Sequence, residues 1–131
     1  MEKKVYTIPH HLPYARIRTV IRKRFGDVQS FVVKLEYNVA DQTAIEEDWE
    51  PVARFDHNPE SETGHDIRKE GLHMDVCIPN GDDARAWGFP DIPVNQAPDW
   101  CEKHFKKKYI RLSKAFCNEY GIDKWNRPMS R

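Results

Sequence analysis

The sequence has little of what marks a secreted, disulfide-stabilised or membrane-spanning protein. Its three cysteines are an odd number and lack the CxxC spacing of redox and zinc motifs. No apolar run approaches the roughly 20 residues that cross a bilayer, and residues 1–18 lack the apolar core of a secretory signal. We therefore expect a cytoplasmic protein with reduced thiols and no membrane contact.

An excess of either charge is also missing. The 21 lysine and arginine residues equal the 21 aspartate and glutamate residues, so the net charge indicates no class of partner. The sequence contains no glycine-rich phosphate loop and no Ser-His-Asp or Cys-His spacing typical of a nucleophilic enzyme. These absences exclude the common nucleotide-binding motifs, and we expect no cofactor.

What is present suits one small domain covering residues 1–131. A chain of 131 residues has the usual length of a single domain. The 39% of hydrophobic residues is below average and the 32% of charged residues is above it, which predicts a modest core under a polar surface. Four tryptophans, five tyrosines and six phenylalanines supply enough apolar area for that core.

Two stretches with a period of two predict a β-hairpin. In residues 16–24 apolar positions alternate with arginines, interrupted by Val20, and in residues 31–39 apolar and polar side chains alternate. Phe25-Gly26-Asp27 supplies the turn between them. Further strands are expected at residues 49–56 and 72–78, so that the sheet occupies residues 14–79.

Prolines and glycines set the expected limits of the sheet. Pro51 predicts an edge position or a late start for the third strand, because proline cannot donate to the ladder. Pro9 and Pro13 predict an extended lead-in at residues 1–13. Two segments are left outside regular strands: residues 57–71, a loop interrupted by Pro59, Gly64 and Gly71, and residues 82–94, a turn or extended segment.

The sequence predicts one long helix at residues 95–121. Asn95 is a suitable N-cap, Gly121 is a natural C′ residue, and Pro98 fits only in the first turn. The apolar residues form one stripe: Cys101, Phe105, Tyr109, Leu112, Phe116 and Tyr120. The expected fold is α+β, an antiparallel four- to five-stranded sheet with this helix packed on its apolar face and residues 122–131 as a tail.

The face of the sheet opposite the helix is expected to be basic. Its candidate nucleic-acid contacts are Arg16, Arg18, Arg22, Arg24 and Lys34. Arginines two residues apart along a strand lie roughly 6.5–7 Å apart, close to the spacing of successive phosphates, and guanidinium binds phosphate through two hydrogen bonds. The alternative is an ordinary solvated face on which the same arginines pair with acids.

Residues 54–76 carry the candidate chemistry, with three of the six histidines. Histidine titrates near neutral pH, so two imidazoles, or an imidazole and a carboxylate, can move protons when an RNA 2′-hydroxyl attacks its phosphate. The predicted catalytic residues are Arg54, Asp56, His57, His65 and His73. Asp66 and Asp75 are predicted to support them.

Two alternatives stay open for the same residues. Imidazole and carboxylate groups are zinc ligands, but the eight-residue spacing of the histidines matches no compact ligand motif, so the first prediction is a site without metal. The other alternative is a polar loop whose histidines face solvent.

The stretch VARFDHNPESETGHDIRKEGLHMDV resembles the signature of the TumE-like toxin family of prokaryotic toxin–antitoxin pairs. The matching positions are Arg54, Phe55, Asp56, His57, Gly64, His65 and Asp66. The chain also resembles a related group of uncharacterised prokaryotic proteins, in the strands FVVKLEY and WEPVARFDH and the helix start VNQAPDWCEKHF. It differs from the toxin pattern by lacking a tight HxH or HHxH cluster and by inserting NPESET after His57. The resemblance implies a compact α+β protein that targets RNA and is neutralised by an antitoxin.

Three functional hypotheses follow. The first is a toxin-like, metal-independent ribonuclease, with RNA as its target and an antitoxin protein as its partner. The second is a binding module without catalysis, which contacts nucleic acid through the basic face or a protein through Trp87, Trp100 and Trp125. The third is a metal-dependent hydrolase that uses the histidines and aspartates as ligands. No oligomeric state is predicted.

Overall fold

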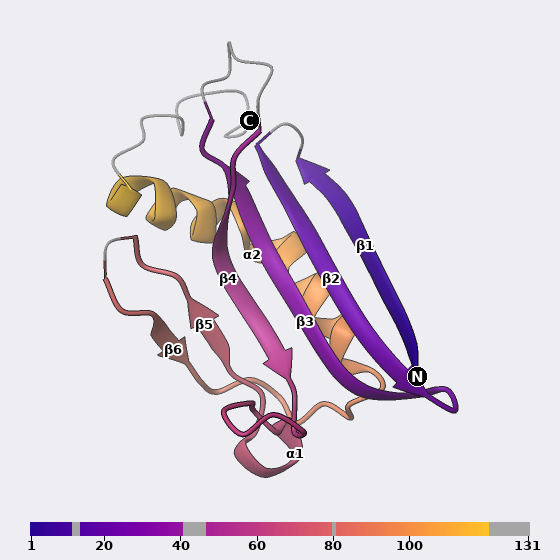
Figure 1. The fold of residues 1–131 in the computed structure, drawn as a ribbon. Helices are drawn as coiled ribbons and strands as arrows, with labels where there is room; N and C mark the ends of the chain where they lie inside the picture. Colours follow the sequence, from indigo (N-terminus) through magenta and orange to yellow (C-terminus); the bar gives the residue numbers. More distant parts are fainter. Residues whose placement is uncertain (12–13, 41–46, 80, 121–131) are drawn as a thin grey trace.

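The computed structural model describes residues 1–11, 14–40, 47–79 and 81–120. Within these residues it is an α+β structure, a six-stranded antiparallel sheet in the order β1-β2-β3-β4-β5-β6 with helix α2 across one face (Figure 1). The elements are β1 (Glu2–His11), β2 (Ala15–Arg24), β3 (Asp27–Asn38), β4 (Trp49–His57), α1 (Ile67–Glu70), β5 (Met74–Val76), β6 (Ala84–Ala86) and α2 (Ala97–Tyr120). The α+β class, the antiparallel sheet and the long C-terminal helix are confirmed, and the predicted four to five strands are corrected to six.

The β2–β3 hairpin follows the predicted alternation. Ile17, Thr19 and Ile21 are buried, while the side chains between them are half-buried or exposed. Phe25 and Gly26 form a two-residue turn with φ values of 52° and 84°. Positive φ at both central positions is typical of a type I′ turn, whose twist matches that of the paired strands.

The expected lead-in at residues 1–13 is corrected to an edge strand. β1 pairs with β2 from Glu2, opposite Lys23, to Ile8, opposite Ile17, and its register shifts in the stretch that contains Pro9. An edge strand tolerates proline there because part of its backbone N–H groups need no ladder partner. Pro13 lies outside the described residues.

Pro51 predicted an edge position or a late start for this strand, but β4 is an inner strand that begins at Trp49, before the proline. It pairs with β3 along its length and with β5 through Ala53–Phe55. The β3–β4 register shifts between Leu35 and Glu36, so Pro51 lies at a bulge and beyond the stretch that pairs with β5. Proline is tolerated at this inner position because neither neighbour requires its missing N–H group.

The short elements lie where the sequence pattern is weakest. β5 covers three residues of the strand predicted at 72–78, and the ambiguous segment 82–94 contains β6. The loop expected at residues 57–71 contains α1, a single helical turn that Asp66 caps by accepting a hydrogen bond from the Arg68 backbone. Three residues are too few to establish a period of two or of 3.6.

α2 covers the apolar face of the sheet, as predicted. Its Phe105 ring lies 5.1 Å from the Phe55 ring of β4, and its Phe116 ring lies 6.3 Å from the Tyr37 ring of β3. Burying one phenylalanine contributes about 1.5–3 kcal/mol, so this layer provides much of the stability. In the predicted stripe Cys101, Phe105 and Phe116 are buried, Tyr109 and Leu112 are half-buried, and Tyr120 is exposed. No helix in the described residues is long and apolar enough to cross a membrane.

The helix begins two residues later than predicted, at Ala97. Asn95 is therefore not its N-cap; its side chain accepts a hydrogen bond from the Val28 backbone at 2.8 Å and donates one to Asp27 at 3.0 Å. These bonds hold the start of β3 to the segment before α2. Pro98 lies in the first turn, as predicted. Gly121 and the tail at residues 122–131 lie outside the described residues.

A buried carboxylate joins α2 to the first two strands. Glu102, only 7% exposed, accepts hydrogen bonds from the Tyr6 hydroxyl and the Thr19 hydroxyl, each 2.6 Å long. Burial of the phenol and its hydrogen bond to the carboxylate raise the pKa of Tyr6 to about 12. The edge strand is thereby fixed to the helix by a polar contact inside the core layer.

Candidate functional site

The sheet face opposite α2 carries a charged row that crosses five strands. Its members are paired in register: Arg18 with Lys34, Lys34 with Arg54, Arg54 with Asp75, and Asp75 with Arg85. Neighbouring strands lie about 4.8 Å apart, and residues directly opposite one another point to the same face. The row therefore brings β2 to β6 into one line of charged side chains.

A cluster of two histidines and two aspartates lies at the β4–β5 end of this row. It consists of Asp56 on β4, His65 in the loop after β4, His73 immediately before β5, and Asp75 on β5. Each contributes an imidazole nitrogen or a carboxylate oxygen, and these atoms all lie within 4.8 Å of one another. We call these four residues the His-Asp cluster.

The loop after β4 folds back and brings His65 to the sheet. The backbone carbonyl of His65 accepts a hydrogen bond of 2.7 Å from the backbone N–H of Asn58. The His65 ring lies between acids and a guanidinium: Nδ1 is 3.6 Å from the Glu70 carboxylate, and Nε2 is 4.0 Å from Asp56 and 3.2 Å from Arg85 Nη2. The predicted loop thus supplies a member of the site.

His73 is the most deeply buried member of the cluster, with 1% of its surface exposed. Its ring lies 4.4 Å from the His65 ring and 4.8 Å from the Trp87 ring. Neither of its nitrogens has a hydrogen-bond partner among the described residues. Burial, followed by the nearby charges of Arg85 and His65, lowers the pKa of His73, so it is a neutral imidazole at pH 7.

Two arginines flank the cluster. Arg85 Nε donates to Asp75 Oδ1 at 3.0 Å, and Arg54 Nε lies 3.6 Å from the other Asp75 oxygen and 3.9 Å from Asp56. Burial acts to raise the pKa of Asp75, but the hydrogen bond and charge of Arg85 outweigh it and leave the pKa below its ordinary value. Asp75 is therefore an ionised carboxylate in the physiological range.

The structure does not bring His57 and Asp66 into the cluster. His57 is buried on the α2 side of the sheet, where its ring stacks on Phe31 and its Nδ1 accepts a hydrogen bond from the Ile67 backbone at 3.1 Å. Asp66 caps α1 and pairs with Arg68. His57 follows Asp56 directly, so strand alternation turns the two side chains to opposite faces. Both residues shape the loop rather than the cluster.

The predicted basic strip is divided in the structure. Arg16 pairs with Glu36 at 2.8 Å and lies over the Trp49 ring, so its charge is compensated. Arg18 and Lys34 belong to the charged row described above. Arg22 and Arg24 lie further along β2, toward the turn.

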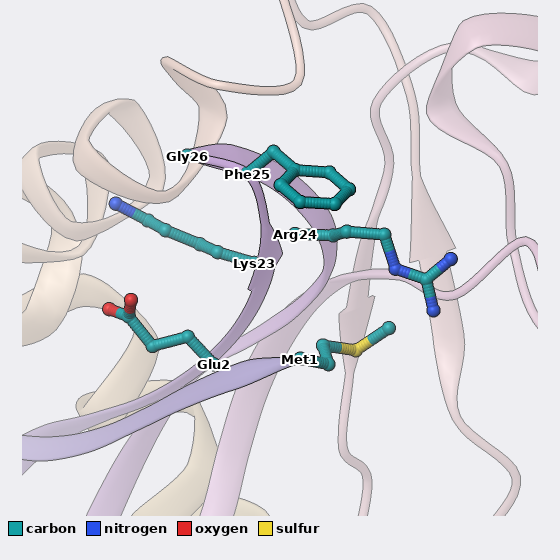
Figure 2. Close-up of a pocket in the computed structure, with 6 residues that line it drawn as sticks. All are labelled: Met1, Glu2, Lys23, Arg24, Phe25 and Gly26. Atoms are coloured by element: carbon teal, nitrogen blue, oxygen red, sulfur yellow. The ribbon is translucent and has the colours of Figure 1, made fainter.

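Arg24 borders a hollow of about 330 Å³ between the first residues of the chain and the β2–β3 turn. Figure 2 shows its guanidinium extending beside Phe25 and away from Lys23 and Glu2. Phe25 is 99% exposed at the tip of the turn. The hollow has no cluster of metal-ligating groups among the described residues, and it lies apart from the His-Asp cluster.

Sequence reasoning missed Arg85 and Glu70, and it placed Trp87 in a possible protein interface rather than beside the histidines. Arg85 and Trp87 come from the segment around β6, which is too short for a periodic signal, and Glu70 comes from the single turn of α1. The alternation of Arg85 between two alanines is the only local indication of a strand there. Pairing across the sheet, which needs the fold, places these residues beside His65 and His73.

The donor set of the cluster suits a divalent first-row metal ion. Two imidazole nitrogens and two carboxylate oxygens match the ligands used by Zn²⁺, Fe²⁺ and Mn²⁺. Each carboxylate has a second oxygen that can keep its contact with Arg54 or Arg85 while the first binds an ion. The cluster therefore combines a metal-ligand set with two flanking guanidinium groups.

Comparison with known proteins gives a family but no activity. No curated protein and no solved structure matches the chain. Residues 1–122 match the family described as a domain of unknown function, DUF7718, and nothing in that match links the chain to the TumE-like toxins. The match spans all eight elements of the sheet and helices, and the chain belongs to the DUF7718 family.

Proposed function

We propose that the protein is a divalent-metal-dependent hydrolase, with the four residues of the His-Asp cluster as metal ligands. The observation that carries the proposal is His73, a buried imidazole whose two nitrogens lack hydrogen-bond partners among the described residues. Leaving a buried polar group unsatisfied costs about 1–3 kcal/mol. Coordination of an ion shared with Asp56, His65 and Asp75 would satisfy one of these nitrogens.

The burial of His73 also favours a metal ion over direct acid–base catalysis. The His65 and Trp87 rings cover it, so a scissile phosphate cannot approach its nitrogens closely. A general acid or base must come within hydrogen-bond reach of the group it protonates or deprotonates. A metal ion is small enough to reach His73, and its water ligands can act on a substrate outside the cluster.

The proposed chemistry divides between the metal and the two arginines. The four residues of the His-Asp cluster would hold the ion. A bound divalent ion would lower the pKa of a coordinated water and so would supply a hydroxide nucleophile near neutral pH. Arg54 and Arg85, which contact the ligand Asp75, are placed to stabilise negative charge on a phosphate ester.

The toxin-like, RNA-directed role expected from the sequence stays a second proposal. The observation in its favour is the partly exposed His65, which lies beside Asp56 and Arg85 on the open face. Expression without a neighbouring antitoxin gene should arrest growth, and His65→Ala should abolish the arrest. Equal toxicity of the variant would remove His65 from that role.

A model phosphodiester tests the hydrolase directly. Protein stripped with EDTA should not turn over bis(p-nitrophenyl) phosphate, and addition of about one equivalent of Mn²⁺ or Zn²⁺ per chain should start the reaction. Asp56→Asn and His73→Gln should lower the rate by at least about 100-fold, since removal of a metal ligand exceeds outer-shell effects. His104→Gln, on the α2 side, is the matched control and should keep the rate. Full activity in EDTA, or inactivity with both metals, would contradict the proposal.

A further inference from the structure

A groove on the open face lies beside the strand that carries Asp56 of the His-Asp cluster. It has a volume of about 550 Å³ and is lined on the sheet by Val20, Arg22, Val32 and Lys34. Val20 pairs with Val32 across β2 and β3, and Val32 pairs with Asp56 on β4. The groove is therefore one strand away from a ligand of the proposed metal.

The groove combines an apolar floor with cations on two sides. Val20 and Val32 form the floor, in a row between two rows of charged residues. Arg18 and Lys34 lie opposite each other in the row on one side, and Arg22 lies on the other side. No shift in pairing interrupts β2 and β3 between Ala15 and Arg22, so these rows remain adjacent on the same face.

The net charge of this surface is positive. Arg18, Arg22, Lys34 and Arg54 are the cations around the groove, and Lys3 pairs with Arg22 from β1. The acids on the same face are Asp56, a proposed metal ligand, and Asp75, which pairs with Arg54, while Glu60 lines the loop side of the groove. The sequence has a net charge of zero, yet the described residues concentrate basic groups on the sheet face opposite α2.

We infer that this groove binds single-stranded nucleic acid and presents a phosphodiester to the His-Asp cluster. The inference rests on the proposed hydrolase, because it names the substrate of the same site. An unpaired base can lie on the valine floor while the phosphates on either side contact Arg18, Lys34 and Arg22. A duplex cannot place a base there, since its bases are paired and stacked inside the helix.

Trp87 supplies a second contact for a base, on the far side of the cluster. It is 55% exposed, lies against the His73 ring, and has the Arg85 guanidinium 5.9 Å from its ring centre. Stacking of a base on an exposed aromatic ring contributes about 1–3 kcal/mol and tolerates any base. The strand would then pass from the valine floor, across the cluster, to Trp87.

Fluorescence anisotropy with labelled oligonucleotides of about ten nucleotides tests the inference. Wild-type protein in EDTA should bind single-stranded oligonucleotides more tightly than a duplex of the same length, with log affinity falling linearly with log salt. Arg22→Gln/Lys34→Gln should weaken binding at least about tenfold, and Trp87→Ala should weaken it by a similar factor. Lys106→Gln/Lys107→Gln removes the same charge from the exposed side of α2 and should leave the affinity unchanged.

The outcomes separate this inference from the metal proposal. His73→Gln should lose metal-dependent turnover yet bind oligonucleotides in EDTA as the wild type does, because the groove residues are intact. Three results would each overturn the inference that the groove binds single-stranded nucleic acid. They are equal weakening of binding by Lys106→Gln/Lys107→Gln, equal affinity of the wild type for a duplex, and no binding of oligonucleotides at low salt. Absence of metal binding by the wild type, with normal oligonucleotide binding, would overturn the hydrolase proposal and leave the nucleic-acid groove intact.

Discussion

At the scale of single residues, strand alternation decides which predicted groups can act together. Asp56 and His57 are neighbours in the sequence, yet one joins the His-Asp cluster and the other packs beneath the sheet on Phe31. His65 and His73 are eight positions apart and their rings lie 4.4 Å from each other. Proximity in the sequence was therefore a poor guide to the site, while the face of each strand residue was a good one.

His57→Ala tests the structural role assigned to this histidine. The substitution removes a buried ring and leaves the Ile67 backbone N–H without its acceptor, so it should destabilise the protein by about 3 kcal/mol. Urea unfolding at pH 7 measures the loss. The folded variant should bind metal as the wild type does. A stable variant that has lost its metal would instead place His57 among the ligands.

His104 predicts a dependence of stability on pH. Its ring stacks on Trp100 at 5.2 Å, and burial, followed by the charges of Lys108 and Lys107, lowers its pKa. The folded state then binds fewer protons than the unfolded state, where the pKa is about 6.5. This contribution to stability is present above pH about 6.5 and declines as the pH falls below it.

The measurement is the free energy of unfolding at pH about 7.5 and about 5.5. His104→Gln should lose less stability than the wild type between these values, because its side chain does not titrate. An identical loss in both proteins would show that burial of His104 does not disfavour its protonation. The other histidines contribute equally to the pH dependence of unfolding in both proteins. The difference between the two proteins therefore reports His104 alone.

At the scale of elements, long periodic segments were predictable and short ones were not. The β2–β3 alternation and the α2 stripe each extend over many residues, and both elements formed with the expected faces buried. Pro9 and Pro13 indicate a segment without regular pairing, whereas β1 is an edge strand that tolerates a proline at position 9. β6 and α1 are too short for a pattern, and they carry Arg85 and Glu70 of the site.

The contact between Glu102 and the first two strands predicts how strongly α2 stabilises the edge of the sheet. It is the polar group through which α2 holds β1 and β2, by two hydrogen bonds of 2.6 Å. Hydrogen bonds to charged groups contribute about 1.5–3 kcal/mol each, so Glu102→Ala should destabilise the protein by about 2–4 kcal/mol. Backbone amides of β1 should also exchange faster with deuterium, because the edge strand loses its anchor.

Tyr6→Phe is the smaller change at the same contact. It removes one donor and keeps the Thr19 bond, so its loss of stability should be less than that of Glu102→Ala. Urea unfolding compares the two variants. A Glu102→Ala protein as stable as the wild type, with unchanged exchange in β1, would mean that apolar packing alone holds the helix to this end of the sheet.

At the scale of the whole molecule, the two faces of the sheet differ in the residues that they carry. The face covered by α2 (Figure 1) holds the core, from Ile17 on β2 to Phe55 on β4. The opposite face holds the charged row, the groove and the His-Asp cluster. Composition and periodicity predicted this division. They could not predict the six-stranded order, because the pairing of short strands depends on contacts between distant parts of the chain.

The candidate site was predictable in its residue types and only partly in its membership. Arg54, Asp56, His65, His73 and Asp75 were all singled out from the sequence, and the structure brings them together. The burial of His73, on which the proposal of a metal site rests, is not visible in any linear spacing. The eight-residue spacing of the histidines counts against a metal only if all ligands share one local motif, whereas the four cluster residues come from β4, the loop after it, and β5 with the residue before it.

Isothermal titration of the EDTA-stripped, dialysed protein with Zn²⁺ and Mn²⁺ measures metal binding by the His-Asp cluster. The wild type and His104→Gln should each bind about one ion per chain. Asp56→Asn and His73→Gln should lose more affinity than the roughly 10–100-fold effect of outer-shell changes. Circular dichroism of each variant confirms that it is folded. Absence of binding by the wild type, or equal affinity in folded His73→Gln, would contradict metal binding by the cluster.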